Sequence, residues 1–204
     1  MSSVAIVILA AGASQRMGAP KLLLRHRGRT LLRLAVDAAL GSSCRPVLVV
    51  LGASAPLLQP DLADLPVQVV HNLDWARGLS ASIRSGIEAL SSAADPPEAA
   101  VLALCDQPFV SSANLEALVT AFSSARRPIV ASEYGGALGV PALFARPLWP
   151  ELVALVGEAG AKRVIRAHRE EVWPVPCPQG ALDVDTPDDY DAVCAQPNGP
   201  PPSP

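Results

Sequence analysis

The sequence predicts an α/β fold, a three-layer sandwich in which helices cover both faces of a mostly parallel sheet. Short runs rich in Val, Ile and Ala are typical of buried strands. Segments with apolar residues at helical spacing alternate with them, and Gly or Pro separates the two kinds. The 204 residues suffice for one domain with its own core. We expect that domain over residues 1–195 and a Pro-rich, disordered tail over residues 196–204.

The first part of the chain holds a strand, a loop and a helix. Residues 5–9 form an unbroken apolar run rich in Val and Ile, which predicts a buried strand. A Gly-containing loop over residues 10–18 follows. Thr30 then suits the N-cap of a helix, because apolar residues recur at helical spacing after it until Gly41, which suits the helix end.

The middle of the chain continues the alternation. Apolar runs predict buried strands at residues 46–51, 67–70 and 99–104, and residues 80–90 place three apolar side chains on one helical face. Asp106 stands just past the last of these strands. Because ligands bind beyond the carboxyl ends of parallel strands, we expect Asp106 and the loop after the first strand to line one crevice.

The last part of the chain alternates in the same way. In order, we expect a helix from Ser112 through Phe122, a strand at 129–131, an extended segment at 137–144, short helices at 148–156 and 161–168, a strand at 172–175, and a helix opened by Thr186 and Pro187.

Composition restricts the class of partner. The net charge of −3 gives no bulk attraction to nucleic acid or an anionic membrane, and no apolar run is long enough to span a membrane. The four cysteines lack metal-ligand spacing, so we expect reduced thiols and a cytoplasmic protein. The chain has 14 Arg but only two Lys, Lys21 and Lys162. A lysine ammonium is a compact charge that suits phosphate.

The first candidate site is the loop from Leu9 to Lys21. Its small residues let backbone N–H groups approach an anion closely, and Arg16 and Lys21 add full positive charge, a combination that suits a triphosphate. Gly-Lys-Ser/Thr is absent, so the loop is not a Walker P-loop. The alternative is a solvated turn with two surface cations.

The second candidate site consists of carboxylates at strand ends. Asp106 could hold Mg²⁺, which prefers one or two carboxylates together with phosphate oxygens. The alternative is an Asp-x-Pro turn. Alternation along an extended segment places Asp183 and Asp185 on one side, where Asp185 could supply a second metal carboxylate. Helix capping explains Thr186 and the residues after it but does not require Asp185.

The third candidate site is the segment 72–83, in which Asn, Trp, Gly and Ser precede a helix N-terminus. Such a segment could receive a polar, phosphorylated acceptor. Packing, rather than stacking on a ring, is the more common role for a residue such as Trp75.

Together these motifs resemble the MobA-like NTP transferase family, over residues 4–192. Four of them occur in the family's order: residues 9–21, 72–86, 106–108 and 185–187. The resemblance implies a Rossmann-like sheet of the nucleotide-diphospho-sugar transferase type. It also implies an Mg²⁺-dependent nucleotidyltransferase over residues 1–195.

The resemblance carries roles onto matching positions. Catalytic roles fall on Arg16, Lys21 and Asp106. Nucleotide or acceptor binding falls on Ala10, Ala11, Gly12, Ser14, Arg16, Lys21, Asn72, Gly78, Ser80 and Ser82. Mg²⁺ would be held by Asp106 and Asp185.

Within the family, Ala11 and Gln107 resemble the molybdenum cofactor cytidylyltransferase (MocA-like) branch, whereas the guanylyl branch tends to have Gly and Thr there. This implies transfer of CMP from CTP, the preferred nucleotide, to the terminal phosphate of molybdopterin, with release of pyrophosphate. The alternatives are transfer from GTP, transfer to another phosphorylated acceptor, and a non-catalytic carrier that delivers nucleotide or cofactor to a molybdenum hydroxylase. The two carboxylates favour catalysis. Some relatives are named as pigment oxidoreductases, an activity that the sequence leaves open.

The chain departs from the family pattern twice. The family often has Gly-His-Pro where residues 139–141 are Gly-Val-Pro, and Gly-Asp-x-Gly-Ala-Arg where residues 157–162 are Gly-Glu-Ala-Gly-Ala-Lys. Both departures lie in the half expected to bind the acceptor, so they concern the acceptor's identity more than the nucleotide chemistry.

Overall fold

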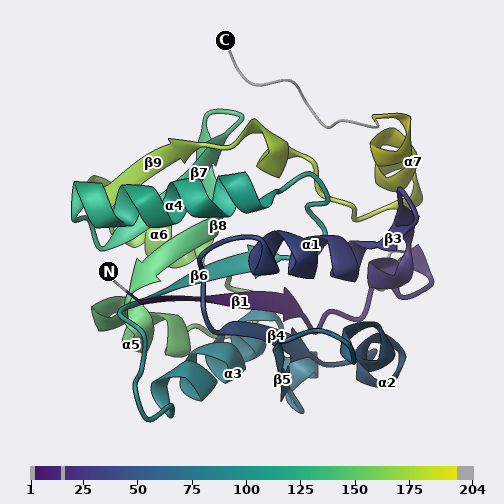
Figure 1. The fold of residues 1–204 in the computed structure, drawn as a ribbon, viewed down its shortest axis with the longest axis horizontal. Coiled ribbons are helices and arrows are strands. Elements are labelled where there is room, and N and C mark those ends of the chain that lie inside the picture. Colours follow the sequence, from purple (N-terminus) through teal and green to yellow (C-terminus); the bar gives the residue numbers. More distant parts are fainter. Residues whose placement is uncertain (1–2, 15–16, 197–204) are drawn as a thin grey trace.

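The computed structural model of the protein describes residues 3–14 and 17–196 and places a seven-stranded sheet between two layers of helices (Figure 1). The strand order is β5-β4-β1-β6-β8-β7-β9. These strands are β1 (Val4–Ala10), β4 (Val47–Leu51), β5 (Gln68–His71), β6 (Ala99–Leu104), β7 (Ile129–Tyr134), β8 (Ala137–Ala145) and β9 (Val172–Pro176). The strands β2 (Arg25–His26) and β3 (Arg29–Thr30) form a separate hairpin.

The sheet is mostly parallel, as predicted, with one reversed strand. β8 runs antiparallel to both β6 and β7, whereas the pairs β1–β4, β1–β6, β4–β5 and β7–β9 are parallel. Gly135 and Gly136 join β7 to β8 with φ angles of +57° and +72°. Both angles are in the left-handed region that a two-residue hairpin turn requires and that glycine adopts without steric cost.

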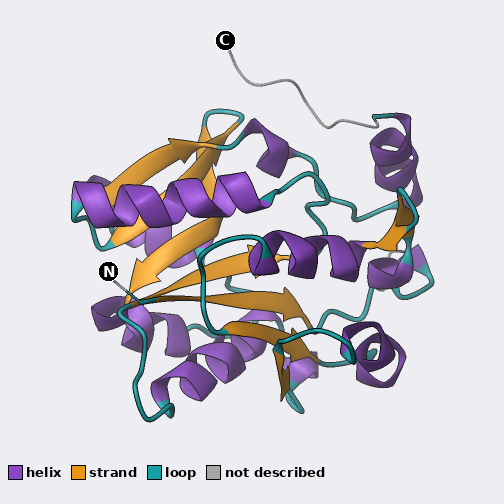
Figure 2. Cartoon of the chain, in the orientation of Figure 1, coloured by secondary structure: helices purple, strands orange, loops and turns teal. Residues whose placement is uncertain are grey.

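Helices cover both faces of the sheet (Figures 1 and 2). They are α1 (Leu31–Leu40), α2 (Ala55–Leu58), α3 (Leu79–Ser91), α4 (Ser112–Ala125), α5 (Trp149–Val153), α6 (Lys162–Ala167) and α7 (Pro187–Ala195). One core cluster joins the sheet to α1, α2 and α4, and the other joins it to α3, α5 and α6. α7 lies beside the start of α1 in a third, small cluster.

β1 lies at the centre of both cores. Every residue of β1 is buried, and Ile6 and Ile8 contribute to the core beneath α1 while Val7 and Leu9 contribute to the core beneath α3. Burial of one such side chain contributes about 1.5–3 kcal/mol. The strand that precedes the first candidate site is therefore anchored in both cores.

The predicted elements differ from the observed ones mainly in their ends. Ser111, not Ser112, caps α4, and the helix expected at residues 148–156 is only the five residues of α5. The sequence analysis did not predict α2 or the β2–β3 hairpin. The expected tail lies outside the described residues, apart from residue 196.

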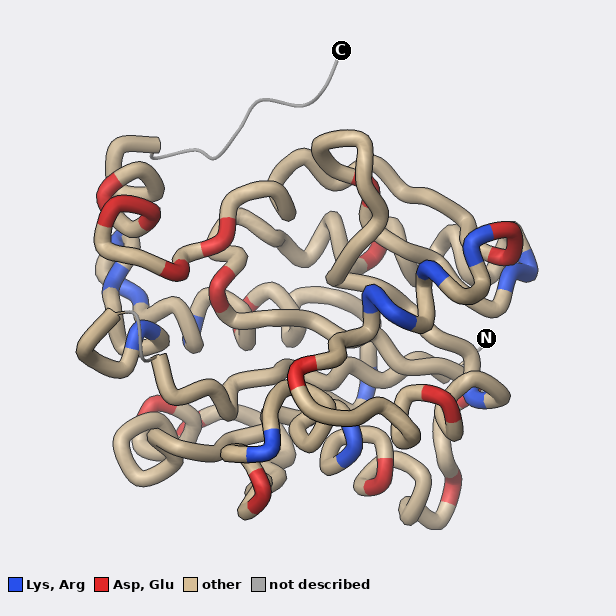
Figure 3. Tube along the Cα trace, turned by 180° about the vertical axis from the view of Figure 1, so that it is seen from behind, with Lys and Arg blue, Asp and Glu red and all other residues tan. Residues whose placement is uncertain are grey.

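Two surface properties bear on possible partners. No described helix is long and apolar enough to cross a membrane. Basic and acidic positions are interspersed along the described trace (Figure 3). This distribution agrees with the small net charge of the whole chain.

Candidate active site

A cavity of about 620 Å³ opens at the carboxyl edge of the parallel strands. Leu9 pairs with Leu104 in the register of β1 and β6, so the loop after β1 and Asp106 after β6 leave the sheet side by side. The cavity is lined by Leu9, Ala10, Ala11, Gly12, Ala13, Ser14, Lys21, Leu22, Trp75, Ala76, Gly78, Leu79, Ser82, Leu104, Cys105, Asp106, Glu158 and Asp185. The expected crevice is therefore present.

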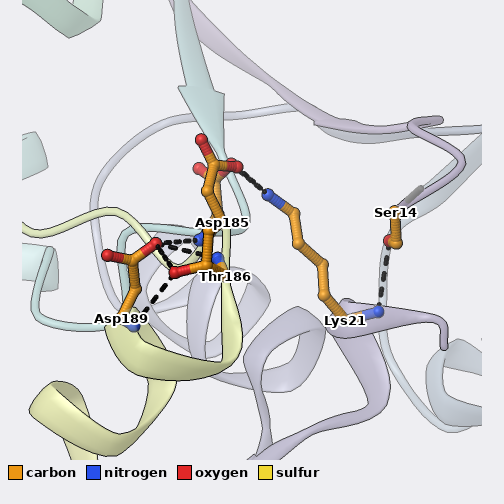
Figure 4. Close-up of polar contacts among 6 residues, drawn as sticks. Ser14, Lys21, Asp185, Thr186 and Asp189 are labelled. Atoms are coloured by element: carbon orange, nitrogen blue, oxygen red, sulfur yellow. Dashed lines mark hydrogen bonds and ion pairs between the residues drawn. The ribbon is translucent and has the colours of Figure 1, made fainter. Parts of the chain in front are cut away.

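The loop after β1 folds back on itself through Ser14. Ser14 has a φ of +51°, and its Oγ accepts a hydrogen bond of 3.1 Å from the backbone N–H of Lys21 (Figure 4). The backbone N–H of Met17 donates to the Ser14 carbonyl at 3.0 Å. These bonds start the short 3-10 helix Lys21–Leu23 at the cavity wall and fix where the Lys21 side chain begins.

Lys21 joins the two predicted metal carboxylates. Its Nζ lies 2.8 Å from Asp106 Oδ2 and 2.8 Å from Asp185 Oδ1. Figure 4 shows the lysine reaching from its 3-10 helix toward Asp185. The side chains of Lys21 and Asp106 are 15% and 19% exposed, whereas that of Asp185 is 36% exposed, so the lysine and the first carboxylate are shielded from water and the second carboxylate is more open. Sequence positions separated by up to 164 residues thus meet at one point.

The segment that carries Asp185 is held against the end of β6. The backbone N–H of Val184 donates to the Asp106 carbonyl at 2.8 Å. Asp189 Oδ2 accepts hydrogen bonds from the backbone N–H groups of Asp185 and Thr186, at 3.1 and 2.8 Å. Thr186 and Asp189 form the capping box of α7, so the helix cap also positions the second carboxylate (Figure 4).

The electrostatics of the centre favour bound cations and a charged lysine. Burial lowers the pKa of Lys21, but the Asp106 and Asp185 carboxylates more than offset this and leave the pKa above its ordinary value. Burial also raises the pKa of Asp183, and the neighbouring Asp106 raises it further.

The centre fits a divalent cation bound with phosphate. Asp106 Oδ1 is buried and makes no hydrogen bond, so one carboxylate oxygen retains its full capacity as a ligand. Within the described residues no group of three or more His, Cys, Asp or Glu side chains could hold a metal. Two carboxylates are what Mg²⁺ needs from a protein when phosphate oxygens and water complete its shell.

Of the four residues of the segment 72–82 that were predicted to bind nucleotide or acceptor, only two line the first cavity. Gly78 and Ser82 line the cavity, but Asn72 and Ser80 do not. Asn72 is 3% exposed, donates to Ser82 Oγ at 3.1 Å and accepts from the Asp74 backbone N–H at 2.9 Å. Asn72 and Ser80 are thus buried and lie outside the lining of the first cavity, so contact of these two residues with a ligand stays a prediction.

Gly78 brings this segment against the loop before α6. Its φ is +97°, and a Cβ there would lie 2.5 Å from the Gly157 carbonyl oxygen. The backbone N–H of Ser80 donates to the same oxygen at 3.1 Å. Only glycine permits both the left-handed backbone and the close approach, which close one side of the cavity.

A second cavity, of about 240 Å³, adjoins the first. Gln107, Tyr134, Val140, Lys162 and Asp183 line it, with an apolar floor from β6 and α3. Gln107 and Asp183 therefore face this second cavity rather than the first. Asp185 lines the first cavity and Asp183 lines the second, although the two residues are only two positions apart.

Two residues that line the first cavity, Glu158 and Trp75, were not predicted as site residues. Glu158 lines both cavities, and its position in the 157–162 motif was the signal that could have identified it. Trp75 is 38% exposed and lines the first cavity instead of packing in the core. Arg16, predicted to bind phosphate, lies outside the described residues.

Known proteins of similar sequence align with nearly the whole chain. The chain is 34% identical to the purine catabolism protein PucB of Bacillus subtilis, over 92% of this chain and 94% of that protein. It is 33% identical to nicotine blue oxidoreductase of Paenarthrobacter nicotinovorans, over 88% and 91%. It is 24% identical to the molybdenum cofactor cytidylyltransferase of Escherichia coli, over 93% and 95%.

Solved structures share the fold over nearly the whole chain. The crystal structure of Rv0371c from Mycobacterium tuberculosis H37Rv superposes with a TM-score of 0.81 at 30% identity, covering 96% of this chain and 98% of that one. A complex of Rv0371c with manganese gives a TM-score of 0.79 at 29% identity, covering 96% and 100%.

The family model of the MobA-like NTP transferase domain matches residues 6–172. That span contains the loop after β1, the segment before α3 and Asp106, which together make most of the first cavity. The chain therefore belongs to the MobA-like NTP transferase family, and the protein is a nucleotidyltransferase.

Proposed function

We propose that the protein transfers CMP from CTP to the terminal phosphate of a molybdopterin-type acceptor, with Mg²⁺ as cofactor and pyrophosphate as the second product. The similarity to a cytidylyltransferase over 93% of the chain supports this reaction. So does Ala11, which stands where the guanylyl branch tends to have Gly. A bound manganese ion in a related crystal structure supports a divalent metal.

One observation carries the proposal. The Lys21 ammonium and the carboxylates of Asp106 and Asp185 meet at one point of a cavity that is also lined by the loop of small residues after β1. A triphosphate needs cationic side chains and close backbone N–H groups, and a bound metal needs carboxylates. Both sets of groups are present within one shielded volume.

The proposed chemistry is an in-line displacement at the α-phosphorus. A terminal phosphate oxygen of the acceptor forms the new P–O bond as the bond to pyrophosphate breaks, so the enzyme need not form a covalent intermediate. Lys21 and Arg16 stabilise the charge that grows on pyrophosphate. The loop from Ala10 to Ser14 and the segment from Gly78 to Ser82 hold the nucleotide and acceptor in line. Mg²⁺, held by Asp106 and Asp185, would neutralise phosphate charge.

Two alternatives use the same site. Transfer from GTP would require the part of the cavity near Ala11 to accommodate a purine base. A non-catalytic carrier would hold nucleotide or cofactor and deliver it to a molybdenum hydroxylase, the partner also proposed for the enzyme. A carrier needs no reacting centre, so the pairing of Asp106 and Asp185 around Lys21 favours catalysis.

A pyrophosphate-release assay tests the proposal. CTP, GTP and ATP are each supplied with Mg²⁺, with and without molybdenum cofactor. We expect release that depends on the acceptor and is fastest with CTP. Faster release with GTP would support the guanylyl alternative, and binding without release would support the carrier. Oxidation of NADH or NADPH without pyrophosphate release would instead assign an oxidoreductase activity, which is the name carried by one relative.

A further inference from the structure

Trp75 places an aromatic side chain on the wall of the first cavity. Among the described residues that line this cavity, it is the only one with an aromatic ring. The side chain is 38% exposed. A tryptophan stabilises a fold by removing a large apolar area from water, and Trp75 leaves part of that area uncovered. Part of the side chain is therefore available to a ligand.

The backbone of the turn that carries Trp75 is held at both ends. Trp75 begins a short 3-10 helix. Just before this helix, Asn72 accepts a hydrogen bond of 2.9 Å from the Asp74 backbone N–H and donates one of 3.1 Å to Ser82 Oγ. Just after it, the backbone N–H of Gly78 donates to the Trp75 carbonyl at 3.2 Å. The buried Asn72 thus anchors the turn, and the tryptophan side chain starts from a fixed point.

Gly52 allows Trp75 to approach the loop after β1. A Cβ at Gly52 would lie 2.7 Å from Trp75 Cβ and 2.7 Å from Ala11 Cβ, so no side chain fits between these two residues. The backbone N–H of Ala53 donates to the Ala11 carbonyl at 3.3 Å, which ties the loop after β4 to the loop after β1. Trp75 and Ala11 therefore lie on either side of a single glycine, and both line the first cavity.

Trp75 and the charged centre follow different strands of the sheet. The strand order β5-β4-β1-β6 places β5, which precedes Trp75, three strand spacings from β6, which precedes Asp106 (Figure 1). At about 4.8 Å per spacing, these two strands are roughly 14 Å apart. A triphosphate bound at Lys21, Asp106 and Asp185 would thus leave the opposite end of an elongated nucleotide, its base, on the side of Trp75.

We propose that Trp75 is the platform on which the base of the nucleoside triphosphate stacks. The inference rests on the proposed function for the presence of a nucleotide in the first cavity. Stacking on an aromatic side chain raises affinity about fivefold to hundredfold and tolerates every base, because every base has a π face. Trp75 therefore supplies affinity for the base, whereas Ala11 would govern the choice between bases.

The test compares nucleotides with inorganic tripolyphosphate, which has the phosphates but no base. Trp75→Leu should weaken the binding of CTP and of GTP at least about fivefold each and leave the affinity for tripolyphosphate with Mg²⁺ within about twofold of wild type. Trp75→Phe keeps an aromatic ring and should bind CTP within about twofold of wild type. Calorimetric titration measures these affinities.

Intrinsic fluorescence gives a second measurement. The chain has three tryptophans. Trp149 is 3% exposed, Trp173 lies on β9, and neither lines the first cavity. CTP should therefore quench the fluorescence of wild-type protein through Trp75, whereas tripolyphosphate should not. Trp75→Phe should lose this quench although it still binds CTP. Trp173→Leu is the matched control: it removes an exposed tryptophan outside the cavity and should change neither the quench nor the affinity.

Several outcomes would overturn the proposal. They are wild-type CTP affinity in a folded Trp75→Leu protein, an equal loss of affinity for CTP and tripolyphosphate, and a CTP quench that persists in Trp75→Phe. Absence of CTP binding by wild-type protein would overturn it too. Thermal unfolding curves show whether each variant is folded, and if Trp75→Leu is not, the quench in wild type and its loss in Trp75→Phe decide. If these titrations succeed but no nucleotide supports pyrophosphate release, the proposed transfer fails and the stacking role of Trp75 stands.

Discussion

At the scale of single residues, the arrangement of the site depends on Lys21. Its backbone N–H is held by Ser14, and its ammonium is held by Asp106 and Asp185. The ammonium of a lysine in this position can move from the carboxylates to a bound phosphate, because its long, flexible side chain allows the charge to move over several ångströms. We infer that triphosphate competes with the carboxylates for the ammonium and leaves them to the metal.

Asp106→Asn should lower turnover by about two orders of magnitude or more, because the lost charge removes several kcal/mol of transition-state stabilisation. The fold should persist, since Lys21 keeps its contact with Asp185. The measurements are kcat in the pyrophosphate assay and a thermal unfolding curve. A folded Asp106→Asn protein with a near wild-type rate would show that Asp106 does not hold the metal.

Lys21→Ala should weaken CTP binding and lower turnover, because charge on the triphosphate increases in the transition state. Lys162→Ala is the matched control: it removes the other lysine of the chain, which lines the second cavity and not the first. Calorimetric titration with CTP should distinguish the two variants. If Lys21→Ala bound CTP as wild type does, the phosphate role of the loop after β1 would have to be abandoned.

Ala11→Gly should narrow the preference for CTP over GTP. Ala11 lines the first cavity, where we propose that the nucleotide binds, and removing its methyl group enlarges the space for a base next to the backbone. The expected change is about tenfold to hundredfold at most, the cost of an unpaired polar edge. Gln107→Thr, the other branch difference, serves as a control and should leave the kcat/KM ratio of the two nucleotides unchanged, because Gln107 faces the second cavity. A wild-type enzyme that used GTP better than CTP would overturn the cytidylyl assignment.

At the scale of elements, two helices begin with the same capping box but serve different purposes. Ser111 and Asn114 cap α4, and Thr186 and Asp189 cap α7. Only the second box also binds the backbone N–H of a site residue, Asp185. A cap in this protein can therefore be a stabilising feature alone or a stabilising feature that orients the active site.

The pair of substitutions Thr186→Ala and Ser111→Ala separates these purposes. Each should lower the free energy of unfolding by about 1 kcal/mol, the usual value of an N-cap hydrogen bond. Thr186→Ala should in addition reduce turnover, because the Thr186 hydroxyl no longer holds the Asp189 carboxylate, which accepts the hydrogen bond from the Asp185 backbone. Ser111→Ala should leave turnover unchanged. Chemical denaturation and the pyrophosphate assay supply the two quantities. Equal turnover of the two variants would mean that the cap of α7 does not orient Asp185.

The elements that sequence predicted well are those with strong local signals. The buried strands and the helices begun by Thr30 and Thr186 were predicted closely, because apolar runs and caps act within a few residues. The reversal of β8 was not predicted, although Gly135-Gly136 is a two-residue hairpin signal that was overlooked. The direction of a strand also depends on its neighbours in the sheet, which periodicity does not reveal.

At the scale of the whole molecule, the parallel sheet gathers distant residues at one edge. That rule alone predicted that the loop after β1 and Asp106 would share a cavity. It did not reveal the second cavity, because the sides to which Gln107 and Asp183 turn are set by the packing of β8 and α6 against β6. Nor did it show that Asn72 is buried, since a polar residue in a loop is more often exposed.

The stability of the molecule should depend on pH through His168. Its ring nitrogens lie 2.9 Å from Glu171 Oε1 and 2.9 Å from Glu151 Oε2, and these carboxylates, Glu171 first, raise the pKa of the imidazole. A raised pKa means that the protonated ring is favoured in the folded state. The contribution is therefore complete below the unfolded pKa of about 6.5 and is lost as the pH rises through the folded value.

We expect His168→Gln to be less stable than wild type at pH 5 by under about 1 kcal/mol, because the pairs face solvent. The difference should vanish toward pH 9. Denaturation of both proteins across this range gives the two curves, and Glu171→Gln, which removes one partner, should show a smaller pH-dependent difference. A gap between wild type and His168→Gln that stayed constant with pH would indicate packing and not charge.

The separation of 164 positions between Lys21 and Asp185 also sets the order in which the two residues are synthesised. A ribosome adds about 5–20 residues per second, so roughly 8–33 s pass between the synthesis of these two residues. Until residue 185 is made, the growing chain has the loop after β1 but lacks the second carboxylate. A chain released after residue 106 but before residue 185 would therefore have the proposed nucleotide-binding loop and only one of the two proposed metal carboxylates. We therefore expect a chain that lacks Asp185 to be inactive in the pyrophosphate-release assay.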